Sequence, residues 1–196
     1  PQAFAVETTR LTAVDVPLTG MMLVTGPAGS GRTTAVRSIL AARHAHAAEH
    51  GISLDLALLS PRASTLAHDV AWSHRGDSAQ DRPDLITALI EALGGTPRTS
   101  TASLLSAIPL IGSTGAAADE PEPARAQLAF PRAGHQGIVV IEDVGGFDGS
   151  GDESALATLL KLLRRSDLTV IVEGENATLT SVWELASPLR GARWGL

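Results

Sequence analysis

A chain of 196 residues, 44% hydrophobic and 18% charged, has the length and composition of one globular domain. Its lack of cysteine excludes disulfides, thiolate metal sites and cysteine nucleophiles. A formal net charge of -6 disfavours a nucleic-acid groove without excluding one, and no stretch approaches the about 18 consecutive apolar residues of a membrane-spanning helix.

The termini suggest a segment of a longer protein. The chain begins with Pro1-Gln2-Ala3 rather than an initiator Met, and it ends in the apolar stretch Trp194-Gly195-Leu196. Natural termini usually carry polar, frayed residues. We therefore expect residues 1–196 to be one domain excised from a longer chain.

The first elements predict a strand, a glycine loop, a helix and a second strand. Residues 21–25 form a short apolar run, typical of a buried strand in a parallel sheet. Residues 33–50 keep apolar side chains at helical spacing, and Gly51 is a typical helix terminator. Residues 52–58 alternate apolar side chains with polar or small ones, which predicts a strand that completes a βαβ unit.

The middle of the chain predicts a helix, an insertion and a strand that ends in acids. Residues 81–93 describe a helix that two glycines terminate. Residues 94–137 are rich in Gly, Pro, Ser, Thr and Ala, so we expect a partly disordered insertion. Residues 138–141 are a β-branched run that requires burial on both faces, and Glu142 and Asp143 follow it.

The last elements continue the alternation of helices and strands. We expect a helix at residues 154–165, a strand at 168–172, a short helix at 176–185 before Pro188, and a last strand at 193–196. Strands that alternate with helices predict an α/β fold with a mainly parallel sheet and helices on both faces.

A phosphate-binding motif lies between the first strand and the first helix. Residues 26–33 fit the pattern G-x-x-x-x-G-K-[ST] at every position except the lysine. The residues expected to hold a nucleotide are Gly26, Pro27, Ala28, Gly29, Ser30, Gly31, Arg32, Thr33 and Thr34. Such a loop turns its backbone N–H groups toward phosphate oxygens, and the following helix directs its positive end to the same point. We therefore predict ATP binding with Mg²⁺ on the Thr33 hydroxyl; the alternative is an ordinary glycine-rich turn.

Arg32 replaces the motif's lysine. It keeps the positive charge but carries a wider planar group on a longer stem. Phosphoryl transfer depends on accurate placement of charge. We expect ATP binding to be retained and hydrolysis to be slow or absent.

Glu142 and Asp143 lie where P-loop enzymes carry a Mg²⁺-associated Asp followed by a water-activating Glu, in reversed order. We expect Glu142 to lie beside the loop as a Mg²⁺ ligand and Asp143 to be a candidate catalytic base. The alternative is a solvated acidic strand end.

Two histidines and two arginines are further candidates for site residues. His46 and His50 lie four apart on the first predicted helix but lack a third ligand, so a solvated helix face is favoured and no metal is assigned to them. Arg190 and Arg193 are candidate arginine fingers toward a neighbouring subunit.

Three segments resemble a known family: Pro17-Leu18-Thr19-Gly20 with LVTGPAGSGRTTAVRSIL, the VVIED strand, and TVIVEGENATLTSVWELASPLRGARWGL. Together they are similar to the last ATPase module of FtsK/SpoIIIE-type proteins of actinobacteria, including EccC-like ATPases of type VII secretion. The resemblance covers both ends of the chain but not residues 94–137.

The resemblance implies a RecA-like P-loop fold and a membrane-anchored parent with this domain in the cytoplasm. It also implies tandem ATPase modules, a ring assembly and ATP-driven translocation. Later modules of such proteins are often degenerate, nucleotide-bound regulatory or substrate-docking units, and a secreted protein is a candidate partner. Arg32, Glu142 and Asp143 depart from the family pattern. Two alternatives stay open: an active DNA translocase module and a nucleotide-free interaction domain.

Overall fold

Six parallel strands form the main sheet of this computed structural model, which describes residues 3–6, 13–15, 19–96, 128–177, 183–189, 192 and 194–195. The strands are β3 (Gly20–Thr25), β4 (Ser53–Leu59), β5 (His74–Gly76), β6 (His135–Ile141), β7 (Thr169–Gly174) and β8 (Trp194–Gly195). Their order is β5-β4-β6-β7-β3-β8, and every pairing is parallel. Two more strands, β1 (Ala3–Val6) and β2 (Ala13–Asp15), pair antiparallel in a separate sheet.

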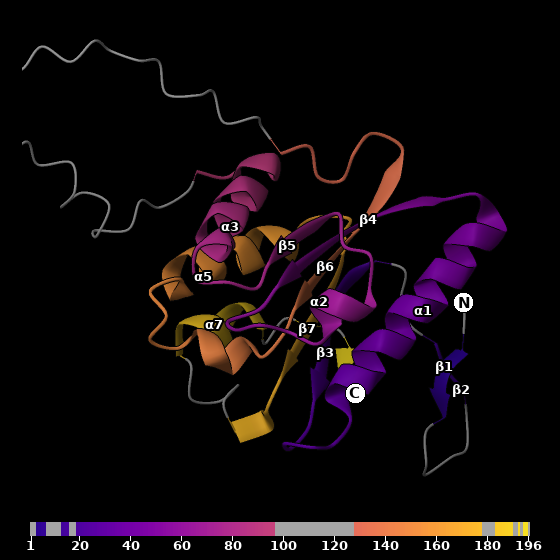
Figure 1. Ribbon diagram of the computed structural model, residues 1–196, viewed down its shortest axis with the longest axis horizontal. Helices are drawn as coiled ribbons and strands as arrows, with labels where there is room; N and C mark the ends of the chain where they lie inside the picture. The colour runs from indigo at the N-terminus through magenta and orange to yellow at the C-terminus, as the bar shows by residue number, and fades with distance from the viewer. Residues whose placement is uncertain are drawn as a thin grey trace, which may run out of the picture.

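Helices cover both faces of the main sheet. They are α1 (Arg32–His50), α2 (Leu66–Asp69), α3 (Asp81–Ala92), α5 (Glu153–Leu163), α7 (Trp183–Leu189) and the 3₁₀ helix η1 (Val144–Phe147). α1 lies on one face, whereas α3, α5 and α7 lie on the other (Figure 1). Among the described residues, none of these helices combines the length and the hydrophobicity needed to cross a bilayer.

The β-branched run of β6 shows why the sheet is central. Val139 and Ile141 pack into the core beneath α3 and α5, whereas Ile138 and Val140 pack beneath α1. All four side chains are fully buried. Successive side chains of a strand point to opposite faces, so a continuous apolar run requires cover on both sides. The predicted α/β class with a parallel sheet is confirmed.

The predicted βαβ unit is present, but its two strands are not neighbours. β3 and β4 flank α1 in sequence, yet β6 and β7 lie between them in the sheet. The pattern of one segment cannot reveal strand order, because later strands insert between earlier ones. This order decides which acids lie near the glycine loop.

Near the carboxyl end the predicted boundaries shift. The short helix expected at 176–185 is found at Trp183–Leu189, and Pro188 lies inside it rather than after it. Leu185 and Leu189 are buried against the sheet, so tertiary packing overrides the local tendency of proline to end a helix. The last expected strand is confirmed as β8, which pairs with β3.

The end of the expected insertion contributes one core residue and the start of a strand. Phe130 is buried, and β6 already begins at His135. Residues 97–127 lie outside the described residues. The short elements α2, β5 and η1 carry too few residues for a recognisable period, and sequence reasoning missed them.

Candidate functional site

The loop between β3 and α1 has the backbone shape of a phosphate-binding turn. Gly29 and Gly31 have φ angles of 74° and 88°, in the left-handed region that favours glycine. The Ser30 N–H donates to the Pro27 carbonyl at 3.2 Å, which closes a tight turn. Residues 27–31 are exposed, so the turn is open to a ligand from solvent.

The first turn of α1 offers amide donors at the same place. The N-cap residue is Gly31, which has no side chain to cap the helix. The first helical bond runs from the Ala35 N–H to the Gly31 carbonyl at 2.9 Å. Within the described residues, the amides of Arg32, Thr33 and Thr34 donate no hydrogen bond. These amides and the helix dipole make a site that favours an anion.

Arg32 is held by protein groups of the loop and of β7. Its Nη1 donates to the Gly26 carbonyl at 2.5 Å, and its Nε forms an ion pair with Glu173. Its Nη2 lies 3.6 Å from the Glu175 carboxylate. The side chain is only 15% exposed, so the guanidinium is folded back onto the loop rather than extended into solvent. The charge expected to serve a phosphate is therefore engaged by an internal carboxylate.

Glu173 is a site residue that sequence reasoning missed. β7 lies between β3 and β6, so the acid beside the loop comes from the end of β7. The Glu173 carboxylate also accepts the Asp143 N–H at 2.7 Å, and its side chain is 4% exposed. Glu173 follows the apolar run of β7 just as Glu142 follows that of β6. This repeated pattern is the feature of the sequence from which Glu173 could have been predicted.

Glu142 lies at the end of β6 in a half-buried setting. Burial raises the pKa of its carboxyl above the ordinary value. Hydrogen bonding with Ser64 and Ser60 opposes this rise in the pKa, whereas the charges of Glu173 and Asp143 add to it. The Oε2 atom of Glu142 is buried without a hydrogen-bond partner. A buried carboxylate oxygen without a donor is suited to a cation.

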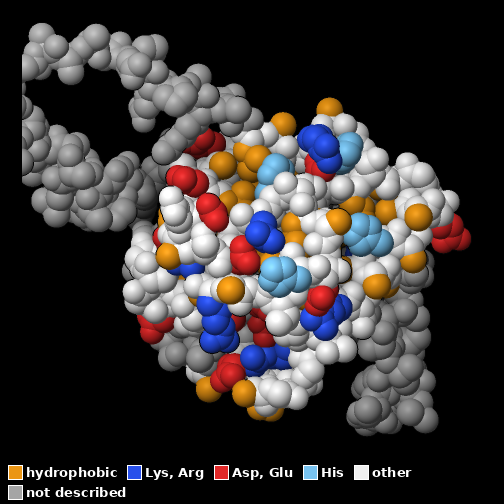
Figure 2. Space-filling view, viewed as in Figure 1, with side chains coloured by type: hydrophobic (Ala, Val, Ile, Leu, Met, Phe, Trp, Pro, Cys, Tyr) orange, Lys and Arg blue, Asp and Glu red, His pale blue; other side chains and the backbone are white. Residues whose placement is uncertain are grey.

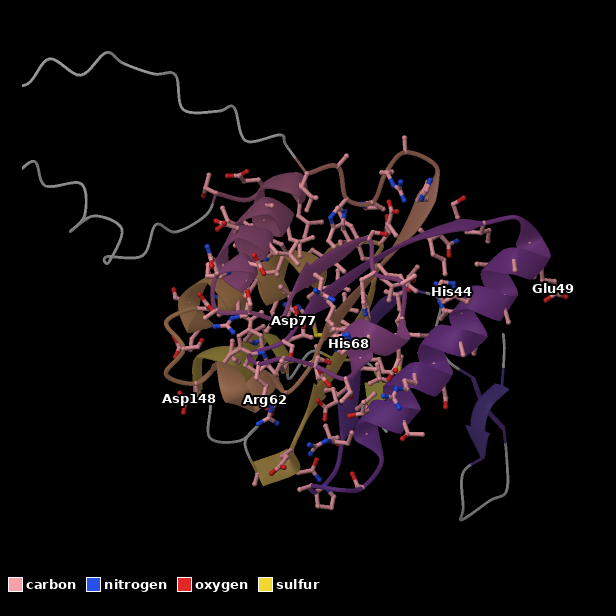
Figure 3. The ribbon with its side chains drawn as sticks, viewed as in Figure 1. His44, Glu49, Arg62, His68, Asp77 and Asp148 are labelled. Atoms are coloured by element: carbon pink, nitrogen blue, oxygen red, sulfur yellow. The ribbon has the colours of Figure 1, made fainter. Side chains whose placement is uncertain are left out.

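Asp143 adopts an unusual backbone conformation. Its φ is 46°, and it is the one non-glycine residue with positive φ in the described part of the chain. Arg62, which is mainly exposed, binds its carboxylate at 2.9 Å. Figure 3 shows Arg62 on the opposite side of the molecule from Glu49, which lies at the carboxyl end of α1. Strained residues of this kind cluster at functional sites, and Asp143 combines this conformation with an ion pair to Arg62.

Not every candidate is brought together. Arg32, Glu142 and Asp143 gather around Glu173, and Thr33 lies in the first turn of the adjacent helix α1. Arg190 and Arg193 lie outside the described residues.

Comparisons with known proteins reveal similarity in structure only. No protein-family model matches the chain, and no curated protein matches it. A solved structure described as an ATPase is similar, with a TM-score of 0.62 and 17% identity over 96% of this chain and 69% of that one.

Two structures of EccC from Thermomonospora curvata are also similar. One contains ATPases 2 and 3 in complex with a signal sequence peptide, with a TM-score of 0.60 and 15% identity over 95% of this chain. The other is the cytoplasmic domain of the type VII secretion ATPase EccC, with a TM-score of 0.59 and 15% identity over 96% of this chain. This chain spans 32% and 20% of those two proteins' chains. The parallel sheet, the glycine loop before α1 and these similarities show an α/β fold of the RecA-like P-loop type.

Proposed function

We propose that this chain is the ATP-binding module of a FtsK/SpoIIIE-type, EccC-like translocation ATPase, with weak or no hydrolysis and a regulatory or substrate-docking role. The observation that carries the proposal is the glycine turn with its uncapped amides at the start of α1. Converging backbone donors at a positive helix end prefer a polyphosphate to other ligands.

The surrounding residues fit a nucleotide with Mg²⁺. The phosphates would meet the loop from Gly26 to Thr34, and Thr33 and Glu142 would hold the ion. The buried, unpartnered oxygen of Glu142 supports this assignment, because a cation would satisfy it. Bound Mg²⁺ supplies positive charge that neutralises phosphate oxygens. Asp143 would be the base, and its Arg62 partner would have to release it first.

The Arg32–Glu173 ion pair supports the proposal that ATP hydrolysis is weak or absent. A guanidinium neutralised by an internal carboxylate contributes little charge to a transferring phosphoryl group. To serve a phosphate, Arg32 must leave both Glu173 and the Gly26 carbonyl. In this proposal the domain therefore binds ATP but does not hydrolyse it efficiently.

The parent protein in this proposal is longer than the chain. One Thermomonospora curvata structure holds ATPases 2 and 3 of EccC with a signal sequence peptide, the other is the cytoplasmic domain of EccC, and this chain corresponds to part of each. We infer tandem ATPase modules, a membrane-anchored actinobacterial parent with this module in the cytoplasm, a ring assembly and a secreted protein substrate.

Charge arrangement favours protein export over DNA translocation. On the face drawn in Figure 2, basic side chains are interspersed with acidic ones. Arg37 pairs with Asp69, and Arg75 lies 3.1 Å from Asp77. Paired cations offer little to a phosphate backbone.

The test is nucleotide-induced thermal stabilisation of the wild type and of Arg32→Ala. The wild type should melt several degrees higher in millimolar Mg·ATP, since a ligand at about 100 times its Kd adds about 2.7 kcal/mol. Arg32→Ala should abolish the shift, because it leaves the buried Glu173 charge uncompensated beside the phosphates. Arg37→Ala, on the same helix and half exposed, is the matched control and should keep the shift.

Two outcomes would count against the proposal. An unchanged melting temperature of the wild type at millimolar nucleotide would favour the nucleotide-free interaction domain. Equal nucleotide-induced shifts in melting temperature for the wild type and Arg32→Ala would show that Arg32 does not contribute to nucleotide binding.

A further inference from the structure

Three potential metal ligands lie together at the carboxyl end of α1. His46, Glu49 and His50 each present a ligand atom, and these atoms all lie within 4.8 Å of one another. The two imidazole rings are tilted at 39° with their centroids 4.1 Å apart. Spacings of three and four residues bring side chains to one side of a helix. Glu49 is the third ligand that the spacing of the two histidines alone does not reveal.

The backbone orients one of the two imidazoles. His50 Nδ1 lies 2.8 Å from the His46 carbonyl oxygen. A carbonyl can only accept, so Nδ1 carries the proton and donates. The Nε2 lone pair of His50 is then left for a ligand. Metal-binding histidines commonly hold their second ring nitrogen in this way.

The local field favours a cation. The cluster lies in the last turn of α1, where the helix dipole is negative, and Glu49 adds a carboxylate. The nearby cation on the helix, Arg43, is buried and directs its Nη2 to Thr169 Oγ1 at 3.2 Å. Arg43 is therefore turned toward the sheet rather than toward the cluster.

We propose that His46, Glu49 and His50 form a binding site for a divalent transition metal such as Zn²⁺, Ni²⁺ or Cu²⁺. Two imidazole nitrogens and one carboxylate oxygen suit these ions, whereas Mg²⁺ and Ca²⁺ prefer oxygen ligands alone. Bonds of about 2.0–2.1 Å place tetrahedral ligands about 3.3 Å apart. Small adjustments of these side chains, chiefly of the exposed Glu49, would close the remaining gap while His50 keeps its hydrogen bond to the His46 carbonyl.

The site is separate from the candidate nucleotide site. α1 has 19 residues, so its ends lie about 27 Å apart at about 1.5 Å per residue. Figure 3 shows His44 and Glu49 on different sides of α1 near its carboxyl end, so His44 lies outside the cluster. Metal binding can therefore be tested without reference to nucleotide.

The experiment is calorimetric titration of chelator-treated protein with ZnCl₂, repeated with MgCl₂. We expect about one equivalent of Zn²⁺ with a Kd in roughly the micromolar range, and no Mg²⁺ binding at this helix end. Zn²⁺ should also raise the melting temperature, because it binds the folded helix. CuCl₂ should bind more tightly than ZnCl₂.

Variants decide which side chains bind. His50→Ala should weaken Zn²⁺ at least tenfold, and Glu49→Gln should weaken it less, because one ligand charge is lost while both imidazoles remain. His44→Ala, an exposed histidine on the same helix, should bind as the wild type does. Far-UV circular dichroism checks that each variant is folded. The proposal is overturned if the wild type takes up no Zn²⁺ at millimolar concentration, or if His44→Ala and His50→Ala lose equal affinity.

Discussion

At the scale of single residues, Glu173 is the group that sets the electrostatics of the glycine loop. It pairs with Arg32 and accepts the Asp143 amide, so one nearly buried carboxylate links the phosphate loop to the acidic end of β6. Opposite charges in a shielded place attract more strongly than on an open surface. Any anionic ligand at the loop must compete with this carboxylate for Arg32.

Glu173→Gln should therefore tighten nucleotide binding. The amide keeps an oxygen for the Asp143 N–H but removes the charge that holds Arg32. We expect a Kd for Mg·ADP roughly threefold to tenfold lower, as for removal of one competing charge. Fluorescence anisotropy of a labelled nucleotide measures the change.

The matched control is Glu175→Gln, which removes an acid that lies farther from Arg32 and is 38% exposed. It should change the Kd little. Weaker binding by Glu173→Gln than by the wild type would show that Glu173 supports the nucleotide rather than competing with it.

At the scale of elements, the close approach of β5 to α3 fixes this edge strand against the helices that cover one face of the sheet. Gly76 ends β5 beneath the first turn of α3. A Cβ on Gly76 would lie 2.9 Å from the Arg82 Cα and 3.3 Å from Leu85 Cδ2. The backbone of α3 cannot yield as a flexible side chain can, so only glycine fits.

Gly76→Ala should destabilise the protein by about 1–3 kcal/mol, as for overpacking of a tight core position. Urea unfolding followed by circular dichroism measures the loss. Arg75→Ala changes a half-exposed neighbour on the same strand and should cost far less. Equal unfolding midpoints for Gly76→Ala and the wild type would mean that α3 can move away from β5.

At the scale of the whole molecule, Asp55 joins segments that are distant in sequence. Its fully buried carboxylate on β4 accepts the backbone N–H of Arg132 at 2.7 Å and its Nε at 2.9 Å. His135 Nδ1 lies 3.2 Å from the same carboxylate. The contact fixes the segment that leads into β6 against β4.

The stability of the protein should therefore fall in acid. The Arg132 side-chain hydrogen bond holds the pKa of Asp55 well below its ordinary value, although burial opposes the shift. A pKa lower in the folded state gives stability that is present above the unfolded-state pKa, about 3.9, and is lost as the pH falls through the folded-state pKa. Urea unfolding between pH 7 and pH 3 should show a decline that begins near pH 5.

Asp55→Asn should be less stable at pH 7 and should show a smaller decline in acid, because it cannot be protonated. Asp148→Asn, at an exposed acid, should follow the wild-type pH profile. Parallel pH profiles for the wild type and Asp55→Asn would assign the acid sensitivity to other carboxyl groups.

Much of this fold follows from local patterns in the sequence. The apolar run of β6, the periodic α1 and the glycine spacing of the loop are each encoded within a few consecutive residues. Burial of both strand faces and the left-handed glycines follow from that local chemistry. The sequence alone therefore determined the α/β class, the position of the loop and the departure at Arg32.

Only the tertiary structure decided which distant groups meet. The insertion of β7 between β3 and β6 brings Glu173, rather than an acid of β6, onto Arg32. The burial of Asp55 depends on Arg132, which is 77 residues away along the chain. Strand order and long-range ion pairs arise from packing across the whole sheet, and no local period carries that information.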